Sequence, residues 1–319
     1  MKNWFAIFLA LTLSSFSACT QDRAPKAIFI IVDGIPADVV ERVSTPQLDS
    51  IGSYTRAWVG GEAGGETETP TISAVSYNSL ITGTWANKHN VWGNEIKAPD
   101  YRYWDIFRIA RNHDPAQKTA IFSTWLHNRT KLVGDGLPGA GGKKIDYAFD
   151  GFELDEDRFP HDEQKHYLRD IDELVSKEAA RYIEAEGPDL SWVYLEFTDA
   201  VGHQYGDSPE QIAAVELMDK QVGRIWQVIR QRRQQNPGED WLIVVTTDHG
   251  RAANDGKGHG GQSERERTIW IVSNSKRLNS RFAASPAIVD ILPSIATHMN
   301  WQIPDHIQAE FDGLSFIDL

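Results

Sequence analysis

The sequence has almost no cysteine: Cys19 is the only one among 319 residues. No disulfide can therefore form within the chain, so a large core and bound metal must hold the fold. Hydrophobic residues make up 41% and charged residues 24%, a composition that supports a sizeable core and excludes global disorder. The length exceeds one average domain but suits a single large α/β enzyme.

Basic residues are also scarce. Lys and Arg number 32 against 45 Asp and Glu, which gives a net charge of −13. This balance excludes a protein that binds nucleic acid by surrounding its phosphates with cations. If an enzyme with this charge acts on phosphate substrates, a local cation must offset the repulsion, and bound metal is the obvious source.

The N-terminal apolar run, from Trp4 to Leu13, is too short to span a bilayer as a helix. Lys2 precedes it and small residues follow it, which is the layout of a secretory signal. We therefore expect residues 1–18 to be a signal peptide and residues 19–319 to form the mature domain.

The segment from Phe16 to Cys19 resembles the bacterial lipobox, in which a signal peptidase cuts before a lipidated cysteine. This resemblance predicts an exported, periplasmic lipoprotein that contacts the membrane only through a lipid on Cys19. A plain signal peptide with a chance cysteine is the alternative, since Phe16 stands where the lipobox usually has Leu. The sequence leaves the oligomeric state open.

Continuous apolar runs predict buried strands, because a strand covered on both faces needs no polar alternation. Three long runs and two shorter ones fit this description: Ala27–Val32, Trp192–Phe197, Trp241–Thr247, Thr119–Phe122 and Thr268–Val272. The long runs are typical of central parallel strands.

Helical patterns lie between these strands. Residues 170–186 form one, and another places five apolar side chains on one face. These are Ile212, Val215, Val222, Ile225 and Ile229. The alternation predicts an α/β fold with a doubly wound, mostly parallel sheet and helices on both faces. Residues 98–165 have weaker periodicity and are expected to form an insertion or cap.

Three of the predicted strands end near an aspartate, at Asp33, Asp199 and Asp248. In open α/β sheets, ligands bind outside the carboxyl ends of the strands. An Asp-Gly pair after a strand is usually only a turn, so Asp33 by itself is a weak signal.

Histidines strengthen this signal. His203 lies four residues after the second of these aspartates, His249 directly follows the third, and His259 stands between glycines. Carboxylate and imidazole ligands together suit zinc, with manganese or iron as alternatives. The other interpretation is a set of helix caps and surface histidines, since histidine is not rare in this chain.

These motifs resemble the alkaline phosphatase superfamily and, within it, the type I phosphodiesterase/nucleotide pyrophosphatase family. The resemblance extends from Asp33 to about His259, with a weaker echo at residues 289–293. It implies an alkaline phosphatase-like catalytic domain and two divalent metal ions, most simply zinc. The resemblance assigns one ion to Asp33, Ser73, Asp248 and His249, and the other to Asp199, His203 and His259.

The same family spacing selects the nucleophile. In the family, the nucleophilic hydroxyl lies ten residues before the Gly of a Leu/Val-Thr-Gly element, here Gly83, which identifies Ser73. The family's His and Asn, sixteen and twenty-one residues further on, then match His89 and Asn94. The family often has Thr with Pro two places on, whereas this chain has Ser73 and Val75. Thr71 is the alternative nucleophile.

Ser73 is predicted to begin a helix that runs to about Thr82. Free N–H groups at a helix N-terminus favour a bound phosphoryl group, and a coordinated metal makes the alkoxide accessible. The resemblance further implies that Asn94 donates a hydrogen bond to a phosphoryl oxygen. A turn residue after Gly93 is the alternative interpretation of Asn94.

A small phosphate-ester or nucleotide substrate is therefore expected, with no nucleic-acid partner. A phosphodiesterase or nucleotide pyrophosphatase is the first hypothesis, because Asn94 is neutral and no Arg follows Ser73. A phosphomonoesterase on the same scaffold and a non-catalytic binding lipoprotein are the alternatives. A sulfatase is unlike this sequence, since Pro and Arg are missing after Ser73.

Some residues near these motifs have two interpretations. Arg251 and Lys257 would either meet a substrate phosphate or be solvated loop charges. Four tryptophans would either stack on a nucleobase or pack in the core or cap. They are Trp85, Trp92, Trp104 and Trp125.

Overall fold

The computed structural model describes residues 24–319. The expected signal peptide and the expected lipid site at Cys19 lie outside the described residues, so both stay predictions. Within the part of the chain that is described, no helix is both long enough and apolar enough to cross a membrane.

Seven strands form one sheet in the order β2-β7-β6-β1-β5-β3-β4. The strands are β1 (Ala24–Val32), β2 (Ser53–Trp58), β3 (Thr119–Ser123), β4 (Tyr147–Phe149), β5 (Leu190–Leu195), β6 (Glu239–Thr246) and β7 (Thr268–Ser273). Strands β6, β1, β5, β3 and β4 run parallel, whereas β7 pairs antiparallel with β6 and β2 pairs antiparallel with β7.

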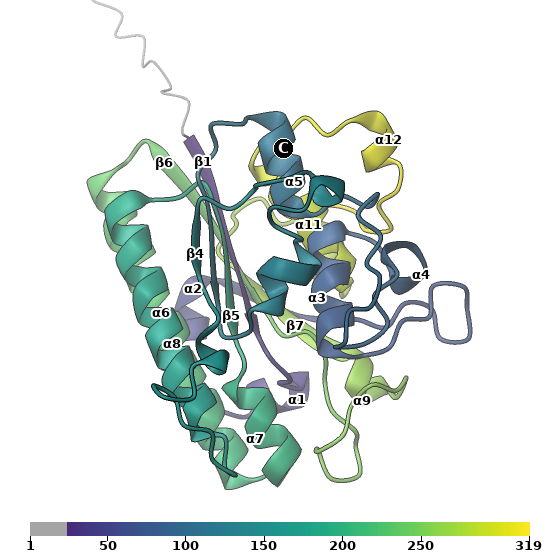
Figure 1. Ribbon diagram of the computed structural model, residues 1–319, viewed down its shortest axis with the longest axis vertical. Helices are drawn as coiled ribbons and strands as arrows, with labels where there is room; N and C mark the ends of the chain where they lie inside the picture. The colour runs from purple at the N-terminus through teal and green to yellow at the C-terminus, as the bar shows by residue number, and fades with distance from the viewer. Residues whose placement is uncertain (1–23) are drawn as a thin grey trace, which may run out of the picture.

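Helices cover both faces of this sheet (Figure 1). The α-helices are α1 (Ala37–Val40), α2 (Pro46–Ile51), α3 (Ser73–Thr82), α4 (Ala86–His89), α5 (Ile106–His113), α6 (His166–Glu186), α7 (Phe197–Tyr205), α8 (Pro209–Gln235), α9 (Glu264–Arg267), α10 (Ser280–Ala283), α11 (Ile291–His298) and α12 (Asp305–Gln308). Shorter turns are the π-helix η1 (Asn128–Leu132) and the 3₁₀ helices η2 (Pro138–Ala140), η3 (Phe152–Leu154) and η4 (Ile288–Asp290).

The central strand β1 shows why its sequence is apolar throughout. Ala27, Phe29 and Ile31 face the core beneath α3, α5 and α11. Ile28 and Ile30 face the opposite core, beneath α6 and α8. Since successive side chains point to opposite faces of a strand, burial on both sides leaves no polar position. The predicted doubly wound, mostly parallel α/β fold is confirmed.

The sequence missed two strands, and both lie at the edges of the sheet. Along β2, five of the six side chains are exposed or half-buried, and only Ala57 is fully buried. The strand β4 has only three residues, and none of them is fully buried. Edge strands lack the continuous apolar run that identifies a central strand.

One strand boundary was wrong. The apolar run ending at Phe197 leaves the sheet at Leu195, and α7 begins at Phe197. The carboxylate of Asp172 on α6 causes this change, because it accepts the backbone N–H groups of Glu196 at 3.0 Å and Phe197 at 2.8 Å. Asp199 therefore lies in the first turn of a helix and not at the end of a strand.

The segment 98–165 departs from the expected insertion in one respect. It contributes α5 and the strands β3 and β4, and both strands belong to the central sheet. The remainder consists of loops and short turns between these elements. On α8, four of the five predicted apolar positions are buried, but Ile212 in the first turn is 38% exposed.

Candidate active site

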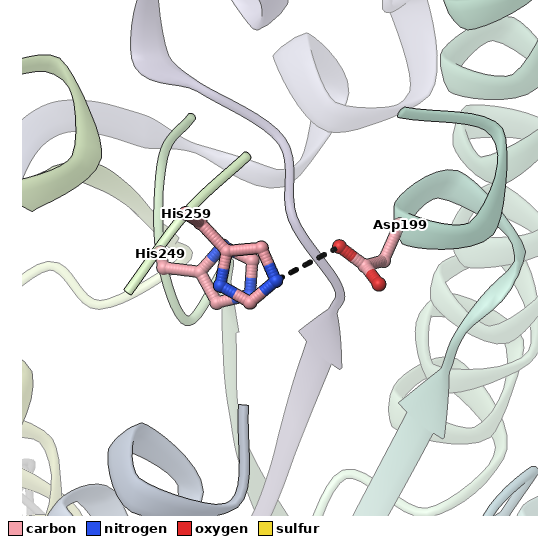
Figure 2. Close-up of side chains that lie close together, drawn as sticks. All are labelled: Asp199, His249 and His259. Atoms are coloured by element: carbon pink, nitrogen blue, oxygen red, sulfur yellow. Dashed lines mark ion pairs between the residues drawn. The ribbon is translucent and has the colours of Figure 1, made fainter. Parts of the chain in front are cut away.

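Segments that follow three adjacent parallel strands meet at the carboxyl edge of the sheet. Asp33 follows β1, Asp248 and His249 follow β6, and Asp199 lies on α7 directly after β5. Strand β1 pairs with β5 on one side and with β6 on the other. This order brings side chains from distant parts of the sequence to one place, as Figure 2 shows for Asp199, His249 and His259.

The first cluster of possible metal ligands is Asp33, Asp248 and His249. The Nε2 atom of His249 lies 3.4 Å from Oδ1 of Asp33 and 3.3 Å from Oδ2 of Asp248. All three residues are buried, with at most 2% of the surface of each exposed. A cation between them would relieve the close approach of two buried carboxylates.

One oxygen of each carboxylate in this cluster is hydrogen-bonded and the other is not. Asp33 Oδ2 accepts a bond from Tyr194 at 2.6 Å and another from Tyr77, and Asp248 Oδ1 accepts the N–H of Gly34 at 3.0 Å. Within residues 24–319, Asp33 Oδ1 and Asp248 Oδ2 are buried without a hydrogen-bond partner. These two unpartnered oxygens, both near His249 Nε2, fit a metal ion.

Burial also disfavours the charged form of these carboxylates. It raises the pKa of Asp248 to about 6, and the nearby Asp199 acts in the same direction. Burial, followed by the charges of Asp248 and Asp199, raises the pKa of Asp33 well above its ordinary value. The ionised form of such buried, neighbouring carboxylates is unfavourable unless a cation binds between them.

The second cluster gathers Asp199, His203 and His259. The two imidazole Nε2 atoms of His203 and His259 are 3.0 Å apart. Oδ2 of Asp199 is 3.3 Å from His203, and Oδ1 is 3.9 Å from His259. The two imidazoles thus lie near different oxygens of this carboxylate. The three residues whose single ligand atoms all lie within 4.8 Å of one another are Asp199, His249 and His259, so His249 stands between the two clusters. Imidazole and carboxylate donors gathered in this way are again a donor set for a cation.

The ring orientations of His249 and His259 suit this chemistry. The Nδ1 atom of His249 bonds the carbonyl of Gly250, and that of His259 bonds the carbonyl of Thr71, both at 2.9 Å. Carbonyls only accept, so Nδ1 carries the proton and Nε2 keeps its lone pair. The two rings stack 3.7 Å apart (Figure 2). Burial lowers the pKa of each to about 4, which leaves both rings neutral at pH 7.

Ser73 is the hydroxyl beside these ligands. It begins α3, as predicted, and its Oγ lies 3.3 Å from Nε2 of His249. The alternative, Thr71, uses its hydroxyl differently: it donates to the carbonyl of Gly261 at 2.9 Å and accepts from the N–H of Gly260 at 3.0 Å. Thr71 thereby fastens the loop that carries His259.

Asn94 lies at the same helix terminus. Its Oδ1 accepts the N–H of Ala74, the residue after Ser73, at 3.0 Å. This bond uses the acceptor of the amide and leaves its NH₂ group as a donor next to the start of α3. Asn94 is exposed to solvent, so the donor is open to a ligand.

His89, which matched the family spacing, is a buried structural residue. Its Nδ1 accepts the N–H of Val91 at 3.1 Å, and its Nε2 bonds Oγ of Ser79 on α3 at 2.9 Å. The ring therefore fastens the segment leading to Asn94 against the helix that begins at Ser73. None of its surface is exposed.

His89 should make stability depend on pH. Burial lowers its pKa from 6.5 to about 3, so between these values the unfolded chain binds a proton that the folded chain does not. The contribution of the neutral His89 ring to stability is therefore complete above pH 6.5 and is lost as the pH falls toward 3. Lowering the pH from 7 to 5 should therefore reduce the free energy of unfolding by about 2 kcal/mol through this group.

Urea unfolding of His89→Gln at both pH values tests this expectation. The variant should lose about 2 kcal/mol less than the wild type between pH 7 and pH 5. The exposed His113 provides a matched control, and His113→Gln should follow the wild type. An unchanged pH dependence in His89→Gln would contradict the expectation.

The structure gives a different surrounding to each of the tryptophans that had two interpretations. Trp85 is 4% exposed and stacks on Trp58 with ring centroids 5.3 Å apart, so it is part of the core. Trp92 is 47% exposed, and its indole N–H donates to Asn90. Trp125 packs edge-on against Tyr77 near the site.

The remaining residues of this group also differ from one another. Trp104 stacks under the guanidinium of Arg108, whose carbon lies 4.3 Å from the ring centroid. Lys257 is exposed. Arg251 is buried and pairs with Asp199, so it is neither a solvated loop charge nor free to meet a phosphate.

Sequence reasoning missed the two tyrosines that bind Asp33. Tyr77 lies four residues after Ser73, one helical turn along α3, and Tyr194 lies in β5. The helical spacing was visible in the sequence and places Tyr77 on the same face as Ser73. No local pattern pointed to Tyr194, because it reads as one more residue of an apolar strand.

Comparison with known proteins gives weak identity over most of the chain. Bis(5'-adenosyl)-triphosphatase enpp4 of Xenopus laevis is 22% identical over 263 residues, which are 77% of this chain and 52% of the relative. Venom phosphodiesterase of Naja atra is 22% identical over 255 residues, 75% of this chain and 28% of the relative. The chain thus spans about half the length of the first relative and less of the second.

Solved structures share the fold. Phosphonate monoester hydrolase of Silicibacter pomeroyi superposes with a TM-score of 0.59 at 14% identity, covering 91% of this chain and 75% of that one. The phosphonate monoester hydrolase of Agrobacterium radiobacter gives 0.59 at 14% identity, covering 91% and 76%. A family model described as type I phosphodiesterase / nucleotide pyrophosphatase matches residues 27–309. A match over most of the sequence shows that the chain belongs to this family.

Proposed function

We propose that the protein is a metal-dependent hydrolase of phosphodiester or nucleotide pyrophosphate bonds, with Ser73 as its nucleophile. One observation carries the proposal: the Ser73 hydroxyl begins a helix and lies 3.3 Å from His249, where two carboxylate–imidazole clusters meet. Family membership and the names of the relatives support the same class of reaction.

The donor atoms fit two divalent cations, most simply zinc. Asp33, Asp248, His249 and Ser73 would hold one, and Asp199, His203 and His259 the other. Oxygen and neutral imidazole nitrogen are donors that zinc accepts. Bound there, the ions would lower the pKa of the serine hydroxyl and offset charge on the phosphoryl group.

The chain's own groups would position the reaction. The phosphoryl group would lie at the N-terminus of α3, where backbone N–H groups favour an anion. Ser73 Oγ would form a bond to phosphorus as the bond to the leaving alcohol or nucleotide breaks. Water would then cleave the phosphoserine ester and restore the hydroxyl.

Asn94 supports a diester over a monoester. Its free NH₂ group would donate to a non-bridging phosphoryl oxygen. Such a neutral donor suits a singly charged diester, whereas a doubly charged monoester calls for further cations. Arg251 does not supply such a cation, because it already pairs with Asp199.

A comparison of three chromogenic substrates tests the proposal. Bis-p-nitrophenyl phosphate and thymidine 5′-monophosphate p-nitrophenyl ester should be hydrolysed at least about tenfold faster than p-nitrophenyl phosphate. Chelation should abolish the activity and added zinc should restore it. Faster hydrolysis of the monoester would instead indicate a phosphomonoesterase, and no hydrolysis of any of them would favour a non-catalytic binding protein.

A further inference from the structure

An arginine lies within the second cluster of possible metal ligands. Arg251 comes two residues after His249, and only 1% of its side chain is exposed. Its Nη2 bonds the carboxylate Oδ1 of Asp199 and also the backbone carbonyl of the same residue at 2.8 Å. Asp199 is one of the three donor residues of this cluster. One of its two carboxylate oxygens is therefore already paired with the fixed positive charge of Arg251.

Backbone carbonyls hold the guanidinium in this position. Nε of Arg251 donates to the carbonyl of Gly34 at 2.9 Å, and Nη1 donates to the carbonyl of Lys257 at 2.9 Å. Four hydrogen bonds to three separate segments fix the side chain, and the planar fork of arginine suits this geometry.

Two glycines make room for the pair. A Cβ atom at Gly202 would overlap the guanidinium of Arg251. A Cβ at Gly34 would lie 2.5 Å from Oδ1 of Asp199 and 2.7 Å from Nη2 of Arg251. The absence of a side chain at both glycines thus leaves the space that the ion pair of Arg251 and Asp199 fills.

The two donor clusters therefore differ in charge. Asp33 and Asp248 give the first cluster two negative charges beside a neutral His249. In the second cluster, Arg251 cancels the single negative charge of Asp199, and the other two donors are imidazoles, which contribute no negative charge. Cation affinity rises with the negative charge of the donor set, and a fixed cation at contact distance opposes a second one.

The clusters also differ in access to solvent. In the first cluster, the side chains of Asp248 and His249 are 0% exposed and that of Asp33 is 2% exposed. In the second, 44% of the His203 side chain and 14% of the Asp199 side chain are exposed. A cation among the second group is better screened and has a shorter path to water.

We propose that Arg251 makes the two cation sites unequal, so that the ion among Asp33, Asp248 and His249 is retained and the ion among Asp199, His203 and His259 is exchangeable. The inference rests on the proposed function, since it assumes that both clusters bind metal. Arg251 is on this view a positioning and charge-setting residue that does not touch the substrate.

Zinc retention tests this directly. The zinc-loaded protein is dialysed against buffers of decreasing free zinc, and the zinc left per chain is counted by atomic emission. The wild type should lose its two ions in steps whose midpoints differ at least about tenfold in free zinc. His203→Ala removes an exposed donor of the second cluster only, so it should abolish the weaker step and leave the stronger one unchanged.

Arg251→Gln should shift the weaker step at least about tenfold toward lower free zinc, because the variant lacks the opposing charge. The matched control is Arg265→Gln, since Arg265 pairs with Asp38 and Asp207 outside the clusters. This control should leave both steps in place.

Three results would overturn the inference: equal steps in the wild type, loss of the stronger step in His203→Ala, or no strengthening in a folded Arg251→Gln. If Arg251→Gln does not fold, the first two measurements still decide. A wild type that binds no zinc at any concentration would instead overturn the proposed function itself.

Discussion

Ser73→Ala is expected to lower the rate of diester hydrolysis by about 10⁴-fold or more while leaving the zinc content close to that of the wild type. The reaction proposed for this site passes through a bond from Ser73 Oγ to phosphorus, and alanine has no atom there. Metal retention should persist because Asp33, Asp248 and His249 remain. Rates with bis-p-nitrophenyl phosphate and zinc counts on the same samples check both parts.

Two further variants sharpen this test. Ser76 lies on the next turn of α3, is fully buried and has no hydrogen-bond partner for its Oγ among the described residues. Ser76→Ala is therefore a matched change that should keep activity within about twofold of the wild type. Normal turnover in Ser73→Ala, together with loss in Thr71→Val, would transfer the nucleophile to Thr71.

The meeting of Asp33 and Asp248 at one edge of the sheet was predictable from short-range rules, whereas their grouping with His249 around one cation was implied by the family resemblance. Apolar runs before Asp33 and Asp248 identified buried parallel strands, and parallel strands carry their carboxyl ends to one edge. The structure places these two strands next to each other. The family spacing then selected Ser73, and the helix it begins was predicted with its correct bounds.

Other features depend on contacts that no local pattern contains. Asp199 lies in a helix and not at the end of a strand, because Asp172 on α6 accepts the backbone N–H groups that follow β5. Arg251 was expected either to meet a substrate phosphate or to be a solvated loop charge. Both expectations were wrong, because its burial depends on Gly34 and Gly202, which lie far from it in the sequence. Long-range contacts of this kind decide which charges face solvent and which are part of a site.

Asp248→Asn is expected to remove the retained zinc ion and to lower hydrolysis by about 10³-fold or more, because it removes half the negative charge of the first cluster. The amide oxygen can still accept the N–H of Gly34, which lies 3.0 Å from Oδ1. The change therefore removes a charge with little change of shape. Zinc counts and diester hydrolysis on the same preparation measure both effects.

The same variant should be more stable than the wild type once metal is removed. Burial raises the pKa of Asp248 to about 6 from its ordinary 3.8. The cost of carrying the negative charge on Asp248 is therefore absent below pH 3.8, grows as the pH rises and is complete above pH 6, where it amounts to about 3 kcal/mol. Asparagine carries no such cost.

Urea unfolding at pH 7 with a chelator and with zinc should thus show opposite orders of stability for Asp248→Asn and the wild type. Asp290 supplies the contrast, since it is equally buried but accepts two bonds of 2.8 Å from Arg281. Asp290→Asn should therefore lower stability in both buffers, by about 1–2 kcal/mol, since Arg281 is itself 37% exposed. A carboxylate that destabilises the chain until a cation arrives is what distinguishes a metal ligand from a structural ion pair. If Asp248→Asn is the less stable protein in chelator as well, Asp248 is structural and the first cluster is not a cation site.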